Sequence, residues 1–213
     1  MKKILFMLFL FILPISFVYA YNNRYFSIEV PDNYEIHMEN IDTFQWINAE
    51  EGSNVVLSIS LKSDEKDINE YTKEEKNNFI EGVIKDLENQ YYKAYEKEMD
   101  VKLVNSEDIK LNGYKGMLIE TKIEDFLNTG STMKQYINIV ESNNFLYSLV
   151  YSTGDKTYNE EDYNQIKKSF KILDEKPINY IYNNIQYLLN YVSLGILIFF
   201  GVVVFRRIKD DKK

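Results

Sequence analysis

A run of 19 uncharged residues near the C-terminus, 187–205, most constrains what this chain can fold into. At about 1.5 Å per residue, a helix of this length spans roughly 28 Å, close to the hydrocarbon thickness of a bilayer. Tyrosines gather on its N-terminal side, as in an interfacial aromatic belt, and Arg206, Arg207 and Lys209 follow it directly. The alternative, a helix buried in a protein core, needs more surrounding chain than is present. We therefore expect a transmembrane helix at 187–205.

The N-terminus carries a second apolar segment. Residues 1–20 begin with Lys2 and Lys3, continue as an apolar run and end in Val18-Tyr19-Ala20, with small residues at the −3 and −1 positions of a cleavage site. This pattern is typical of a secretory signal peptide. An uncleaved N-terminal anchor is the alternative, but the run is short for a spanning helix.

The charges beside the C-terminal segment predict its orientation. The tail 206–213 carries five basic and two acidic residues, and the positive-inside rule keeps such a tail in the cytoplasm. The chain is then a single-pass protein of the cell membrane whose N-terminal domain, residues 21–177, lies outside. Pro177 marks the end of that domain. The linker 178–186 is short, so we expect the domain to lie near the bilayer surface.

The composition of residues 21–177 excludes several kinds of function. This part carries 31 acidic and 18 basic side chains, which repels nucleic acid and anionic lipid head groups and leaves a cationic partner open. Cysteine is absent, which excludes disulfides, thiolate metal sites and cysteine nucleophiles. The one histidine, His37, excludes multi-histidine metal sites. The lack of cysteine and of N-glycosylation sequons in an exported domain indicates a bacterial source.

Periodicity predicts an α+β domain. Thr72 and Glu75 form a capping box, and apolar residues three and four apart predict a long helix from there to about Glu98. A shorter helix is predicted from Asn159 to Phe170, with its apolar residues facing inward. Alternation and turn signals predict strands at 25–30, 44–47, 55–61, 101–111, 116–123, 133–141 and 145–152. Tight turns, such as the Asn112-Gly113 pair between 101–111 and 116–123, make most neighbouring strands antiparallel.

The order of these elements resembles that of the PsbP-like family. The resemblance covers about 25–173 and rests on four segments: 25–34, Leu-Asn-Gly-Tyr-Lys-Gly at 111–116, 145–152 and 169–173. It implies an α/β/α sandwich around a mostly antiparallel sheet of six to seven strands, with one long and one short helix. A C-terminal transmembrane helix is expected here in addition. The family includes photosynthetic lumenal subunits and bacterial exported proteins, and no binding residue is carried over from it.

The sequence contains no motif for catalysis or for a cofactor. A phosphate loop, a G-x-S-x-G elbow, an H-E-x-x-H pair and EF-hand spacing are all missing. His37 as a base needs an orienting partner, so an ordinary loop or strand residue is favoured. Acidic clusters at Glu50-Glu51, at 64–67 and at 160–162 could hold calcium weakly, although a helix start explains the last. We predict no metal and no cofactor.

The candidate contact surface is the loop 125–131. Phe126, Leu127 and Asn128 are exposed there if the segment is a true loop. In the alternative, the two apolar side chains pack under the sheet.

A second group of aromatic residues is expected in and around the core. Its members are Trp46 and three tyrosines at the end of the long helix, Tyr91, Tyr92 and Tyr95. A stack of tyrosines that binds a ligand is the alternative.

These features predict a membrane-anchored extracytoplasmic module, without catalytic activity, that binds or assembles an envelope protein. The alternative is a cell-envelope enzyme that uses paired carboxylates, which a cleft with two close carboxylates of shifted pKa would favour. A sensor that signals inward is disfavoured, because the eight-residue tail carries no output domain.

Overall fold

The computed structural model describes residues 18–23, 25–62, 66–126, 130–142 and 144–173. The predicted linker, transmembrane helix and tail lie outside these residues, as does most of the predicted signal peptide. Within the described ranges, no helix is both long enough and apolar enough to cross a membrane.

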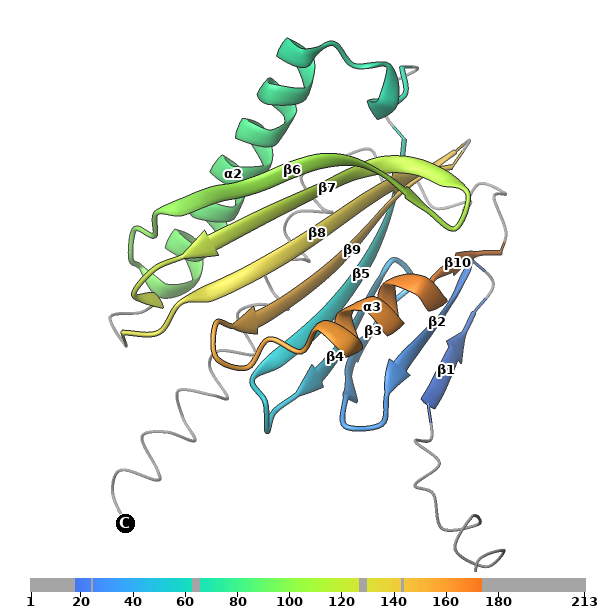
Figure 1. Ribbon diagram of the computed structural model, residues 1–213, viewed down its shortest axis with the longest axis horizontal. Helices are drawn as coiled ribbons and strands as arrows, with labels where there is room; N and C mark the ends of the chain where they lie inside the picture. Colours follow the sequence, from blue (N-terminus) through green and yellow to red (C-terminus); the bar gives the residue numbers. More distant parts are fainter. Residues whose placement is uncertain (1–17, 24, 63–65, 127–129, 143, 174–213) are drawn as a thin grey trace, which may run out of the picture.

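A seven-stranded antiparallel sheet forms the centre of the domain (Figure 1). In spatial order its strands are β3 (Glu35–Glu39), β4 (Thr43–Asn48), β5 (Ser53–Leu61), β9 (Phe145–Gly154), β8 (Met133–Glu141), β7 (Tyr114–Ile123) and β6 (Val101–Leu111). Asn112 and Gly113 make the β6–β7 turn with φ angles of 48° and 99°, as the Asn-Gly pair predicted. The expected α+β class and mostly antiparallel sheet are therefore confirmed.

Helix α2 (Lys73–Tyr95) covers one face of this sheet. The predicted capping box is present, because the Thr72 side chain accepts from the Glu75 amide and the Glu75 carboxylate accepts from the Thr72 amide. The helix ends earlier than predicted, because Glu96 adopts a left-handed conformation with φ of 52°. A single 3-10 turn, η1 (Ile68–Glu70), precedes it.

Helix α3 (Glu160–Ser169) and a three-stranded sheet cover the opposite face (Figure 1). The strands of this small sheet are β1 (Val18–Asn22), β2 (Phe26–Pro31) and β10 (Lys171–Ile172), with β2 in the centre. The sandwich thus has a helix on one side and a helix with a second sheet on the other.

Both faces of the main sheet are apolar along its central strands. Val56, Val150 and Ile137 pack toward α2, whereas Leu57 and Leu149 pack toward α3. Burial of apolar surface at roughly 25 cal/mol per Å² makes these two cores the main source of stability. Both faces of the predicted strand at 145–152 are covered in this way.

Three strands, β1, β3 and β10, escaped prediction, and β1 overlaps the predicted signal peptide. β3 alternates as Glu-Ile-His-Met-Glu, but it is only five residues long and its side chains are mostly exposed, and β10 is two residues long. The segment predicted as a strand at 25–30 is β2, which belongs to the small sheet rather than to the main one.

An aromatic cluster joins the small sheet to the main sheet. Tyr21 of β1 contacts the rings of Phe26, Phe44 and Trp46 at centroid distances of 5.5–5.6 Å, and Phe26 lies 4.8 Å from Phe44. The predicted core position of Trp46 is confirmed. β1 runs across the predicted cleavage point after Ala20, so cleavage there would leave Tyr21 as the first residue with its ring in this cluster.

Two glycines provide a matched test of the fold. A Cβ at Gly116 in β7 would lie 1.9 Å from the carbonyl oxygen of Ile139 on β8, so the strands could not stay paired. Gly82, exposed on α2, has no heavy atom within 4 Å of such a Cβ. We expect Gly116→Ala to lower the free energy of unfolding by at least about 2 kcal/mol. Gly82→Ala should raise it by about 0.5–1 kcal/mol. Urea unfolding of the full chain in detergent, followed by circular dichroism, measures both, and equal effects would contradict the described β7–β8 pairing.

Candidate functional site

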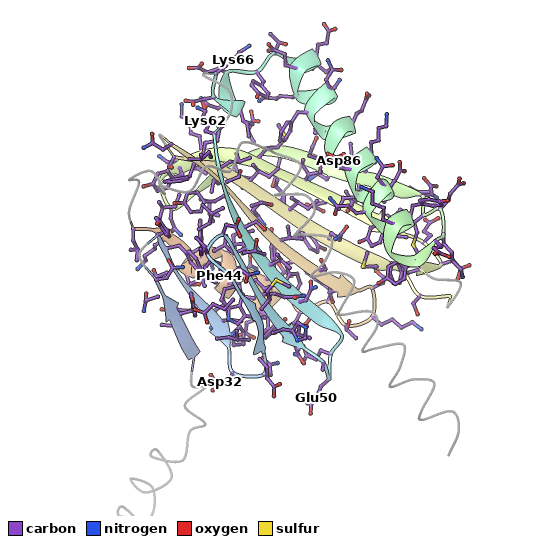
Figure 2. All side chains as sticks on the ribbon, turned by 180° about the vertical axis from the view of Figure 1, so that it is seen from behind. Asp32, Phe44, Glu50, Lys62, Lys66 and Asp86 are labelled. Carbon is purple, nitrogen blue, oxygen red and sulfur yellow. The ribbon has the colours of Figure 1, made fainter. Side chains whose placement is uncertain are left out.

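Acidic side chains gather at the end of the domain where the β2–β3 turn, the β4–β5 turn and the start of α3 lie. Asp32 and Glu50 mark this end in Figure 2. The seven carboxylates that make up this acidic end are Asp32, Glu35, Glu50, Glu51, Glu160, Glu161 and Asp162. In the part of the chain that the structure describes, no lysine forms an ion pair with any of them. None of these carboxylates is therefore neutralised by a lysine ion pair among the described residues, although the exposed Lys156 lies in the loop before α3.

Local hydrogen bonds hold two of the three segments in place. The Asn48 side chain accepts from the amides of Glu50 and Glu51 and so fixes the β4–β5 turn. The Asn159 side chain accepts from the amides of Glu161 and Asp162 as the N-cap of α3. The positive end of this helix favours carboxylates in its first turn.

A pocket of about 410 Å³ opens at the acidic end. The two turns and the edge strand β3 line it, with Asp32, Glu35, His37 and Glu50 as the ionisable side chains and Ile47 among the apolar ones. His37 is exposed on β3, as expected for an ordinary strand residue. The pocket thus offers carboxylates around a small apolar floor.

Behind the turns lies a buried polar cluster. The hydroxyls of Tyr34 and Ser53 share a hydrogen bond of 2.7 Å. Burial raises the pKa of Tyr34 and of its neighbour Tyr151. These phenols stay neutral at physiological pH and hold the β2–β3 turn against β5 and β9.

Asp162 connects this cluster to the acidic surface. Its side chain is only 9% exposed, and its Oδ2 has no hydrogen-bond partner in the structure. Burial raises the pKa of Asp162, and the negative charges of Glu51 and Glu161 raise it further. The structure therefore brings together two acidic clusters that are far apart in the sequence, at the β4–β5 turn and at the start of α3.

The paired-carboxylate alternative finds partial support in this geometry. Glu51 and Asp162 interact electrostatically, and the pKa of Asp162 is raised. However, neither residue is among those that line the pocket. The carboxyl with the shifted pKa therefore does not coincide with this pocket.

The predicted exposure of Phe126 is wrong. Phe126 is 3% exposed and packs edge-on against Tyr91 and Tyr95, both at 5.8 Å between ring centroids. The alternative of packing beneath the sheet is therefore correct for this residue, because the α2 tyrosines offer it an aromatic surface. Leu127 and Asn128 lie outside the described residues.

The α2 tyrosines and the other acidic clusters were the remaining candidates for a site. Tyr91 is buried and Tyr95 partly buried, as expected, whereas Tyr92 is exposed. Asp67 pairs with Lys62 rather than with other carboxylates. Among the described residues, no group of three or more metal-ligating side chains is placed to hold an ion.

Sequence reasoning missed the convergence of Tyr34, Glu51 and Asp162. Each lies in a different turn or helix start, and the run at 160–162 was already explained by helix capping. Only the tertiary fold brings them together.

Comparison with known proteins identifies the family. The model of the PsbP family matches residues 17–172. The chain belongs to the PsbP family. The resemblance inferred from the order of elements is thereby confirmed.

The solved structures to which the chain is similar include two bacterial proteins. Cyanobacterial PsbP (CyanoP) from Synechocystis sp. PCC 6803 is 12% identical, with a TM-score of 0.56, and the match covers 75% of this chain and 95% of that chain. LpqN, involved in cell envelope biogenesis of Mycobacterium tuberculosis, is 13% identical, with a TM-score of 0.43 and coverage of 69% and 82%. At this identity CyanoP shows a shared fold alone. No curated protein matches the sequence.

The raised pKa of Asp162 predicts a pH dependence of stability. The folded chain binds this proton more tightly than the unfolded chain, so stability falls as pH rises through the folded-state pKa. Asp162→Asn should remove the contribution of this carboxyl to the pH dependence of stability. The plot of unfolding free energy against pH should then be flatter between about pH 4, the ordinary pKa of aspartate, and neutral pH. Glu74→Gln, an exposed carboxylate on α2 across the main sheet, is the control and should leave that contribution intact. Urea midpoints over this range measure both variants, and an unchanged slope in Asp162→Asn would contradict the assignment.

Proposed function

We propose that this PsbP-family protein is a single-pass, membrane-anchored extracytoplasmic module that binds or assembles an envelope protein and has no catalytic activity. The anchoring rests on the sequence, with its uncharged segment at 187–205 and the basic tail that follows. The family assignment and the fold shared with CyanoP are consistent with an accessory role.

The observation that carries the proposal is the acidic end. Seven carboxylates from three segments meet there, and no described lysine pairs with them. The nearly buried Asp162, with an unpartnered Oδ2, adds an acceptor beneath that surface. A lysine- or arginine-rich segment of an envelope protein would supply the missing donors and would be steered toward this end by its field.

Charge-neutralised variants test this role. The full chain is crosslinked in its native membranes and recovered, and the amount of each co-purified partner is quantified. We expect Glu50→Gln/Glu51→Gln/Glu161→Gln to reduce recovery of the main partner about tenfold, equivalent to about 1.4 kcal/mol. The matched control, Glu74→Gln/Glu81→Gln/Glu98→Gln, removes three exposed charges on or beside α2 and should retain the partner. Recovery of no partner, or equal loss in both variants, would contradict the proposal.

A further inference from the structure

Four lysines gather at the end of the domain opposite the acidic end. Lys110 and Lys115 lie directly across from each other in the β6–β7 hairpin. Lys168 and Lys171 flank the junction between α3 and β10. The side-chain amide of Asn112, in the hairpin turn, donates to the carbonyl oxygens of Lys168 and Phe170 and fastens the two regions together. We call these four residues the lysine end.

The four lysines of the lysine end form no ion pair within the described fold. All four side chains are exposed, and among the described residues no carboxylate forms an ion pair with them. Two like charges directly opposite in an antiparallel pair are destabilising. A binding role explains why this arrangement is present despite its cost.

Carboxylates near this end are engaged elsewhere. Asp67 pairs with Lys62, and Asp108 pairs with Lys76 at 2.6 Å. The carboxylate of Glu141 accepts from the amide of Ile68 at 2.7 Å. These three carboxylates therefore do not neutralise the four lysines, and Glu39 and Asp42 at the β3–β4 turn lie at the opposite edge of the main sheet from the β6–β7 hairpin.

The chain leaves the described fold at this same end. The amide of Leu173 donates to the carbonyl oxygen of Tyr25 at 2.8 Å, and Leu173 is 54% exposed. Residues 174–186 then lead to the apolar segment at 187–205. Fully extended, these 13 residues reach at most about 45 Å, so the tether keeps the domain near the bilayer without fixing which end faces it.

Apolar side chains accompany the lysines. Leu173 follows Lys171 by two residues, whereas Ile41, in the β3–β4 turn, is 51% exposed at the same end of the strands but at the opposite edge of the main sheet from the β6–β7 hairpin. Lysines beside exposed aliphatic groups match the chemistry of a membrane surface, where anionic head groups border the apolar region.

We propose that the lysine end docks on the anionic head groups of the bilayer that anchors the chain, so that the acidic end points away from the membrane. This inference rests on the proposed anchoring. The net charge of the domain predicts repulsion from anionic lipid, but the separation of charge between the two ends lets one end attract the surface while the other avoids it.

The test uses the full chain reconstituted into vesicles of phosphatidylglycerol and phosphatidylcholine. The chain contains no cysteine, so a fluorophore can be placed on Ile41→Cys at the lysine end or on Asn33→Cys at the acidic end. Quenching by nitroxide-labelled lipid reports which end lies near the bilayer. We expect at least threefold more quenching at Ile41→Cys. The difference should shrink in pure phosphatidylcholine and in about 0.5 M salt, because both weaken the attraction of lysines to the surface.

Charge variants complete the design. Lys110→Gln/Lys115→Gln/Lys168→Gln/Lys171→Gln should abolish the difference between the two labels. The matched control, Lys73→Gln/Lys85→Gln/Lys93→Gln/Lys97→Gln, removes four exposed charges on or beside α2 and should preserve it.

Two results would overturn the inference: equal quenching of the two labels, or quenching that the lysine-end variant leaves unchanged. Flotation of the vesicles is scored first. A chain that does not float with vesicles of either composition disproves the anchoring itself, and the docking with it, whereas a chain that floats but shows no preferred end disproves the docking alone.

Discussion

The fold depends on a single constraint: the central strands of the seven-stranded sheet are apolar on both faces. Val56 and Val150 need cover on one side, and Leu57 and Leu149 need it on the other. A two-layer arrangement would leave one of these faces in water, so the chain builds two outer layers. Helix α2 provides one, and α3 with the small sheet provides the other. The ring contacts from Tyr21 and Phe26 to Phe44 fix the small sheet on its face.

The antiparallel order of the strands also places acidic and basic side chains at opposite ends of the domain. Because neighbouring strands are antiparallel, alternate turns lie at opposite ends of the sheet. The β2–β3 and β4–β5 turns, with Asp32 and Glu50, lie at one end, whereas the β6–β7 turn lies at the other, next to Lys168 (Figure 2 shows Asp32 and Glu50 at one edge). A domain with a strongly negative total charge thus has four exposed lysines without ion pairs at one end. In the proposed arrangement, the membrane and the protein partner occupy opposite ends.

Much of the fold could be predicted from the sequence, because capping boxes and turn pairs depend only on residues within one helix start or one turn. The capping box of Thr72 and Glu75 located the start of α2, and the Asn112-Gly113 pair located the β6–β7 hairpin. Strand β3 escaped because it is only five residues long and buries almost none of its side chains, so its alternation of Ile36 and Met38 with polar residues is a weak signal. The candidate site escaped for a different reason. Asp162 looks like an ordinary helix-start residue, and its proximity to Glu51 depends on contacts between segments more than a hundred residues apart.

The side of the membrane on which the domain lies is the central claim, and cysteine labelling tests it most directly. The chain lacks cysteine, so Glu50→Cys in the acidic end and Lys213→Cys in the tail can each be labelled selectively with a membrane-impermeant maleimide in intact cells. The account predicts that Glu50→Cys is labelled in intact cells and that Lys213→Cys is labelled only after permeabilisation. Labelling of Glu50→Cys only after permeabilisation would contradict it.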